Sequence, residues 1–217
     1  MNKKEKALFI ERKLNELFPN PKAPLNHSNA FTLLIAVLLS AQTTDKRVNI
    51  VTVELFKKAV NSKQMYELGE KKIYELIKTC GLAPKKAKAI FQTSQILNEK
   101  YQGKVPKELP LLEALPGVGH KTASVLVSEF FKIPAFPVDT HIHRLAQRWG
   151  LTNGRSVKQT EKDLKILFDK EKWRDLHLQI IFYGRTFCTA RGCNGTLCFM
   201  CKSLYPNRKS GIKTLKA

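Results

Sequence analysis

The sequence predicts an all-α protein. Apolar residues recur at every third or fourth position through most of the chain, which is the spacing that places them on one face of a helix. No segment alternates apolar and polar residues as a half-buried strand does, and we find no internal repeat of roughly 20–50 residues. Helical segments of this kind, joined without strands, pack as an all-α fold.

The predicted helices follow one another along the chain with recognisable ends. A stripe of apolar residues from Ala7 to Leu17 predicts the first helix, which Pro19 ends. The run Phe31–Gln42 is apolar on every side, as is typical of a central buried helix, and Thr44 can cap the helix that follows. Later stripes predict further helices, in order, at Val48–Ala59, Ile73–Ile77, Ala87–Leu97, Leu111–Leu115, Lys121–Phe131, Ile142–Trp149, Val157–Leu167 and Trp173–Tyr183.

Two other segments are predicted to be irregular. Ile133–Pro137 is bounded by prolines and is the best candidate for a domain boundary. The basic tail from Pro206 to Ala217 is expected to be frayed.

The charge balance indicates a polyanion as partner. The chain carries 38 Lys and Arg residues against 18 Asp and Glu, a net charge of +20. Such a surplus is typical of nucleic-acid binders, with an anionic membrane surface or an acidic protein as alternatives. The longest apolar run, Phe31–Leu39, is far shorter than the roughly 20 residues of a spanning helix. The N-terminal segment has no signal-peptide pattern, so we expect a cytoplasmic protein without a membrane partner.

The segment LPGVGHK at residues 115–121 lies between two predicted helices. Its two glycines, one residue apart, let the backbone approach a ligand closely, and the N–H groups that open the next helix attract an anion. The segment therefore predicts a hairpin that binds a DNA phosphate without reading the base sequence. Its expected contacts are Gly117, Val118, Gly119 and His120. An ordinary turn between two helices is the alternative.

Lys121 and Asp139 are the candidate catalytic residues. Lys121 directly follows the hairpin, where the sugar of a bound nucleotide would lie, although most lysines at helix starts are simply solvated. Desolvation and the positive end of the helix dipole both favour a neutral amine there, which can attack C1′ of a deoxyribose and form a Schiff base. Asp139 can take the proton from this lysine and stabilise positive charge on the sugar, or it can be an N-cap only.

Four cysteines lie close together near the C-terminal end. Cys188, Cys193, Cys198 and Cys201 have the spacing C-x4-C-x4-C-x2-C. Four thiolates in so short a segment favour a 4Fe–4S cluster, with tetrahedral zinc as the alternative. Cys80 stands apart and is expected to be a small buried hydrophobic residue.

These segments together resemble the endonuclease III family of helix-hairpin-helix DNA glycosylases. The resemblance runs from about Ala7 to Tyr205, and the combination of LPGVGHKTA with VDTH, 18 residues from lysine to aspartate, is highly specific. It is carried by LLIAVLLSAQTTDKRVN (33–49), CGLAPKKAKAI (80–90), LEALPGVGHKTASVLV (112–127), VDTHIHRLAQRWGL (138–151) and the four clustered cysteines.

The resemblance implies a fold of two helical lobes with a DNA cleft between them. Residues 23–133 would form a six-helix barrel with the hairpin, and residues 1–22 with 134–217 a second lobe with the iron–sulfur loop. The implied function is a bifunctional glycosylase and AP lyase of base excision repair. It would excise oxidised pyrimidines from duplex DNA through a lysine Schiff base and cleave the strand by β-elimination. The expected partner is duplex DNA with damaged bases or abasic sites, and we expect a monomer with a 4Fe–4S cluster.

The resemblance also implies roles for single residues. Lys121 matches the family's nucleophile and Asp139 its carboxylate. Gln42 matches the side chain that fills the gap left by the flipped base, and Leu82 matches the wedge pressed into the opposite strand. His141 and Arg144 are further expected DNA contacts.

Two positions and the cysteine spacing depart from the family pattern. The family usually has Arg where this chain has His120, and His where this chain has Tyr183. Its common cysteine spacing is x6, x2, x5, so the loop is shorter here.

Two alternative functions remain at the level of the sequence. An adenine glycosylase of the same superfamily lacks the lysine and has an additional C-terminal domain, so Lys121 and the chain length disfavour it. A DNA-binding module without activity would have no need of both Lys121 and Asp139.

Overall fold

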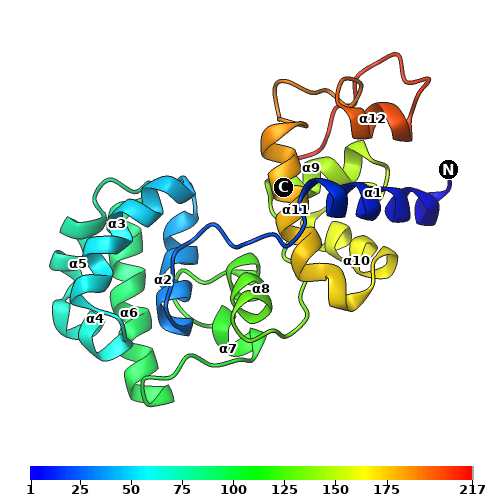
Figure 1. The fold of residues 1–217 in the computed structure, drawn as a ribbon. Coiled ribbons are helices and arrows are strands. Elements are labelled where there is room, and N and C mark those ends of the chain that lie inside the picture. Colours follow the sequence, from blue (N-terminus) through cyan, green and yellow to red (C-terminus); the bar gives the residue numbers. More distant parts are fainter. Residues whose placement is uncertain (217) are drawn as a thin grey trace. The chain divides into compact units, whose positions relative to one another are not determined.

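The computed structural model describes residues 1–216, and every regular element in that range is helical (Figure 1). The all-α prediction is therefore confirmed. The chain divides into two compact units. The hairpin unit comprises Ala23–Ile133, and the cysteine unit comprises Met1–Lys22 together with the described residues from Pro134 onward. Among residues 1–216 we find no helix with the length and apolar composition that a bilayer crossing requires.

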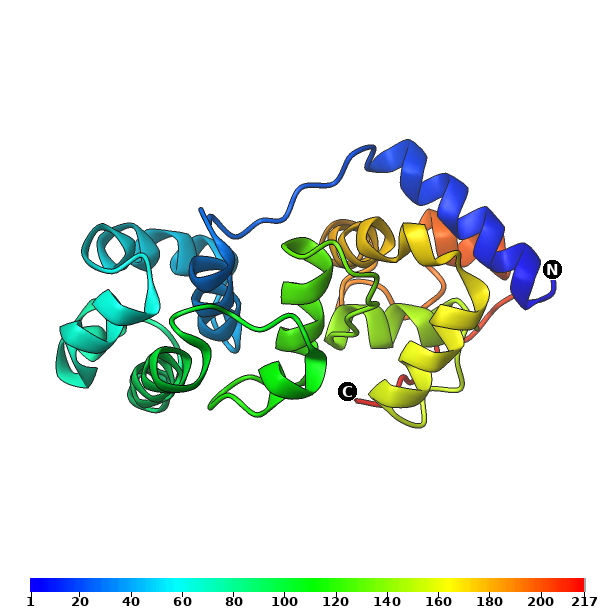
Figure 2. The ribbon, with the colours of Figure 1, turned by 90° about the horizontal axis from the view of Figure 1, so that it is seen from below.

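The hairpin unit is built around one buried helix. Its helices are α2 (Ala30–Ser40), α3 (Asp45–Lys58), α4 (Ser62–Leu68), α5 (Glu70–Ile77), α6 (Ala83–Tyr101), α7 (Leu109–Glu113) and α8 (His120–Glu129). Asn29 caps α2, and every residue from Phe31 to Leu39 is buried, as the all-round apolar sequence predicts. Helix α2 packs against α3, α6 and α8, and α6 also packs against α4 and α5 (Figure 2). Because α8 packs against both α2 and α7, the hairpin between α7 and α8 is anchored to the buried helix of this unit.

The cysteine unit contains both ends of the described chain. Its elements are α1 (Lys3–Leu17), α9 (Thr140–Arg148), α10 (Val157–Leu167), the short 3-10 helix η1 (Lys170–Lys172), α11 (Trp173–Thr186) and α12 (Phe199–Leu204). The apolar face of α1 packs against α10 and α11, and α9 packs against α11. Trp149 and Tyr183 meet edge to face at 5.7 Å in its core, to which the four clustered cysteines also belong. The cysteines are therefore part of the core of this unit.

The sequence patterns missed the short α-helices α4 and α12 and the 3-10 helix η1, and they misjudged the tail. Only Ser62 and Met65 of α4 are buried, so this seven-residue helix shows no repeated apolar stripe. Helix α12 has six residues and follows Cys198 directly. The expectation of a frayed tail is wrong for its described part, because the tail hydrogen-bonds to α9. The N–H of Leu215 donates to Oε1 of Gln147, and the carbonyl of Leu215 accepts from Nε2 of the same side chain.

Candidate functional site

The hairpin between α7 and α8 depends on glycine for two different reasons. Gly117 has φ +76°, and a Cβ there would lie 2.9 Å from Cβ of Ala89, so neither the conformation nor the space admits a side chain. At Gly119 the position of a Cβ has no described atom within 4 Å, so the backbone is open to an approaching ligand. Val118 is buried and its N–H donates to the carbonyl of Leu115 at 3.1 Å, which closes the turn.

The first turn of α8 carries the predicted lysine. Gly119 is the N-cap, and no side chain of residues 1–216 caps this helix start, so its N–H groups are available to an anion. Lys121 is half-buried in this turn. His120 is exposed, and its Nδ1 lies 2.7 Å from Oε1 of Glu113 at the end of α7. The residue that replaces the family's arginine is thus paired with a carboxylate.

Gln42 and Leu82 lie on two neighbouring loops of the same unit. Both have a positive φ, +53° for Gln42 and +59° for Leu82, and both side chains are exposed. Gly81 connects the loops, because its N–H donates to Oγ1 of Thr43 at 3.1 Å. A Cβ on Gly81 would lie 2.5 Å from the carbonyl oxygen of Gln42. The structure therefore brings the two expected intercalating residues together.

Asp139 begins α9 in the cysteine unit. Its Oδ1 accepts the N–H of Ile142 at 2.9 Å, so it is an N-cap, as one of the two interpretations of the sequence required. The cap uses one carboxylate oxygen, and the side chain is only half-buried. The capping hydrogen bond therefore orients the carboxylate and leaves its second oxygen available to another group.

His141 and Arg144 lie in the first two turns of α9. They face the end of α11 and the start of residues 188–201, which carry the four cysteines and are called the cysteine segment below. The guanidinium of Arg144 donates to the carbonyls of Gly184 and Cys188 at 3.1 and 3.0 Å. Burial lowers the pKa of His141, with Asp139 opposing the shift and Arg144 adding to it. Both side chains are half-buried, and the hydrogen bonds of Arg144 connect α9 to the cysteine segment.

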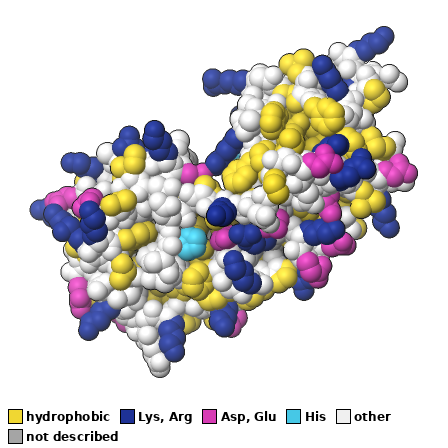
Figure 3. Space-filling model, in the orientation of Figure 1, with side chains coloured by type: hydrophobic (Ala, Val, Ile, Leu, Met, Phe, Trp, Pro, Cys, Tyr) yellow, Lys and Arg dark blue, Asp and Glu magenta, His cyan; other side chains and the backbone are white. Residues whose placement is uncertain are grey.

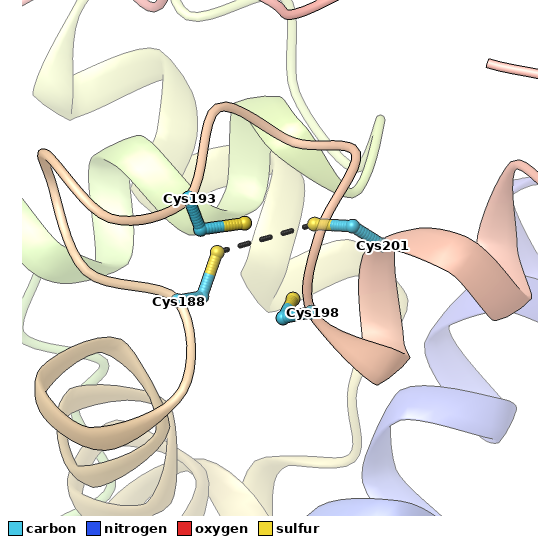
Figure 4. A group of neighbouring side chains, drawn as sticks. All are labelled: Cys188, Cys193, Cys198 and Cys201. Carbon is cyan, nitrogen blue, oxygen red and sulfur yellow. Dashed lines mark hydrogen bonds between the residues drawn. The ribbon is translucent and has the colours of Figure 1, made fainter. Parts of the chain in front are cut away.

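The four cysteines converge on one point (Figure 4). Their Sγ atoms all lie within 4.8 Å of one another, and the Sγ atoms of Cys188 and Cys201 are 3.9 Å apart. Each of the four side chains is at most 9% exposed. The changed spacing in the sequence thus still gathers four thiols in one buried place.

The buried thiols oppose one another's ionisation. Hydrogen bonds from Cys188 and Cys201 hold the pKa of Cys198 far below its usual range, whereas the hydrogen bond to Cys198 raises the pKa of Cys188 to about 12. One thiolate thus suppresses the ionisation of its neighbour. Burial raises the pKa of Cys193, but hydrogen bonds from backbone groups outweigh this effect and leave it lowered. A bound metal centre removes the competition between the thiols.

Arg148 is a residue of this site that the sequence patterns did not reveal. It is 3% exposed, and its Nη1 donates to Sγ of Cys188 at 3.2 Å and to the carbonyl of Thr189 at 2.9 Å. Its Nη2 donates to the carbonyl of Ala190 at 3.4 Å. The one signal in the sequence was that Arg148 follows Arg144 by four residues and therefore lies on the same side of the helix, at the edge of its apolar face. Its charge offsets that of the thiolates.

Apolar side chains line a cavity beside Cys198. The cavity beside Cys198 has a volume of about 220 Å³ and is lined by Leu17, Tyr183, Phe187 and Phe199. Another cavity, of about 390 Å³, lies in the hairpin unit. Apolar side chains gather at the upper right of Figure 3, whereas Lys and Arg side chains are spread over the surface shown. An apolar shell limits the access of water to a metal centre.

Comparison with known proteins decides the family. Residues 35–170 match the model of the HhH-GPD superfamily base excision DNA repair proteins. Endonuclease III of Treponema pallidum is 44% identical over 189 residues, which cover 87% of this chain and 90% of the relative. Endonuclease III of Escherichia coli strain K12 is 44% identical over 188 residues, covering 87% and 89%.

This chain belongs to the endonuclease III family. The resemblance inferred from the motifs is confirmed. A solved structure of a trapped covalent intermediate between an endonuclease III and DNA has a TM-score of 0.87 and 38% identity, covering 92% of this chain and 94% of that chain. The fold of the family therefore extends over nearly the whole sequence.

Within the family, the cysteines of this chain fit a 4Fe–4S cluster. Four buried thiols converge there, with no histidine or carboxylate ligand beside them among residues 1–216, and four thiolates are the normal donor set of such a cluster. Tyr183, which stands where the family usually has His, is buried, and its hydroxyl accepts the N–H of Met200 at 3.1 Å. This departure therefore fixes the start of α12 beside Cys198 and Cys201.

Proposed function

We propose that this chain is a bifunctional DNA glycosylase and AP lyase of base excision repair that removes oxidised pyrimidines from duplex DNA. The observation that carries the proposal is Lys121, half-buried in the first turn of α8 directly after the open backbone of Gly119. The 38% identical neighbour was captured as a covalent intermediate with DNA, which supports a nucleophile in this chain as well. As a DNA repair enzyme it would work in the cytoplasm, on the nucleoid.

In the proposed reaction Lys121 is the nucleophile. The lone pair of its neutral amine forms a bond to C1′, and the N-glycosidic bond breaks with its electron pair leaving on the base. Opening of the sugar ring gives a Schiff base between Nζ and C1′. Loss of a C2′ proton then moves electrons toward C3′, and the 3′-phosphate leaves, which nicks the strand.

We assign the supporting roles to residues of both units. Asp139 would accept the proton of the Lys121 ammonium and stabilise positive charge on the sugar. Gly117, Val118, Gly119 and His120 would bind phosphate through the hairpin, and Gln42 and Leu82 would occupy the space left by the flipped base. His141 and Arg144 would contribute to the DNA surface near α9. Cys188, Cys193, Cys198 and Cys201 would hold the 4Fe–4S cluster, which supplies rigidity to their segment rather than chemistry to the excision.

Borohydride trapping tests the nucleophile. Lys121→Ala should abolish the covalent complex with damaged duplex while DNA affinity stays within about threefold of wild type, because one of many positive charges is lost. Lys63→Ala, at an exposed position of α4, is the matched control and should trap normally. A trapped complex with the Lys121→Ala variant would exclude Lys121 as nucleophile.

The role of Asp139 is tested by a substitution that keeps the cap. Asp139→Asn retains an oxygen that can accept the N–H of Ile142, so the fold should survive. Because the charge is lost, the excision rate should fall by about 100-fold or more. Excision at the wild-type rate would leave Asp139 as an N-cap only.

A further inference from the structure

Gln42 and Leu82 have backbone conformations that their residue types avoid. A positive φ brings Cβ of a non-glycine residue close to the neighbouring carbonyl oxygen. Both residues have this conformation, and both have exposed side chains that no core packing holds. Some other group in the structure must therefore keep both loops in place.

Lys86 is buried directly beneath these two loops. It lies on the first turns of α6, four residues after Leu82, and is only 5% exposed. Its ammonium donates to the carbonyls of Leu39 and Ala41 at 2.7 and 2.5 Å and to Oγ1 of Thr43 at 2.9 Å. Three donors thus meet three acceptors, so the buried charge is satisfied. A cation at this place also interacts favourably with the C-terminal end of α2.

Thr43 extends the contact of Lys86 to the second loop. Its Oγ1 accepts from the ammonium of Lys86 and from the N–H of Gly81, the residue before Leu82. The acceptors of Lys86 at Ala41 and Thr43 flank Gln42 on both sides. One ammonium group and one hydroxyl therefore fix the backbone next to both exposed side chains.

We propose that Lys86 and Thr43 are positioning residues for base flipping, which hold Gln42 and Leu82 ready to enter the DNA duplex. The inference rests on the proposed function, in which these two side chains fill the gap of the flipped base. Flipping costs unstacking energy, and side chains that are already ordered lose little entropy when they enter the duplex. Without Lys86 the two loops would relax to ordinary φ values and would have to be ordered again on each binding event.

The test compares two substrates that differ in the need for flipping. One is a duplex with an oxidised pyrimidine in a base pair, and the other is an abasic site in single-stranded DNA, where no pair has to open. Lys86→Met and Thr43→Val should lower the single-turnover rate on the duplex by about tenfold, which corresponds to about 1.4 kcal/mol. On the single strand both variants should stay within about twofold of wild type, because Lys121 and the hairpin are unchanged.

Conservative variants and a fluorescent base separate positioning from folding. Thr43→Ser keeps the hydroxyl and should restore the duplex rate that Thr43→Val loses. Lys63→Met removes a positive charge from an exposed position and should leave both rates unchanged. With 2-aminopurine opposite the lesion, Lys86→Met and Thr43→Val should reduce the fluorescence rise that reports unstacking, whereas Thr43→Ser should keep it.

Two results would overturn the inference. One is a duplex rate in Thr43→Val equal to that in Thr43→Ser, and the other is an equal loss on duplex and single strand in variants whose thermal unfolding matches wild type. Failure of the proposed function has a different signature, since wild-type protein would then act on neither substrate.

Discussion

Replacement of Arg148 by Met tests whether the cysteine segment depends on a buried charge. The change keeps much of the side-chain volume but removes hydrogen bonds to Sγ and the carbonyl of Cys188 and to the carbonyls of Thr189 and Ala190. A hydrogen bond to a charged group contributes roughly 1.5–3 kcal/mol. Two of these four are long, at 3.3 and 3.4 Å, and burial of the guanidinium offsets part of the gain. We therefore expect a loss of about 3–5 kcal/mol in the free energy of unfolding.

The loss is large enough to measure in two independent ways. For a chain of this size, 1 kcal/mol shifts the unfolding midpoint by about 2–4 °C, so Arg148→Met should unfold about 6–20 °C below wild type. Iron content and visible absorption of the purified protein should fall as well, because the thiolates lose a neighbouring cation. Arg155→Met is the control at an exposed position and should change stability by less than about 0.5 kcal/mol. If Arg148→Met kept full iron and unfolded within about 2 °C of wild type, the charge of Arg148 would have no role in the site.

Three further predictions concern the hairpin and the pH dependence. Gly117→Ala should lower the free energy of unfolding by about 1–3 kcal/mol, because φ is +76° and a Cβ would lie 2.9 Å from Cβ of Ala89. Gly119→Ala should instead fold normally but bind duplex DNA more weakly. Chemical denaturation measures the first effect and fluorescence anisotropy the second, and equal stability losses in the two variants would contradict the distinction. Glu113→Gln removes a carboxylate 2.7 Å from His120 and should raise the affinity for undamaged duplex DNA by about two- to fivefold at low salt. At high salt the variant should show no gain, because salt screens such an interaction. A gain in affinity that persists at high salt would refute this account. Burial lowers the pKa of His141 below its ordinary 6.5, so near that pH the unfolded chain binds more protons than the folded chain. The free energy of unfolding should therefore fall as the pH drops from about 7.5 to about 5.5. The fall should be shallower in His141→Asn, and an unchanged dependence of the unfolding free energy on pH in this variant would mean that another group causes it.

Most of the helices could be predicted from local sequence patterns, because the features that form and end a helix lie within a few residues of one another. The burial of α2 follows from its continuous apolar run, and Asp139 caps α9 through the N–H of a residue three positions away. Helix α4 escaped notice because seven residues with two buried positions show no periodic stripe. The family motifs, in turn, are short segments whose residue types and spacing are visible without any fold.

What the sequence by itself determined about this protein is its all-helical class, its positive charge, its family and the four cysteines near the C-terminal end. Only the tertiary structure decided which side chains hold these features in place. Lys86 meets carbonyls 45 and 47 residues away, and Arg148 meets Cys188 across 40 residues. In the sequence both look like surface residues, since a lysine or arginine is normally solvated. A buried cation is stable only where several acceptors converge on it, and that convergence is a property of packed helices rather than of any segment of the chain.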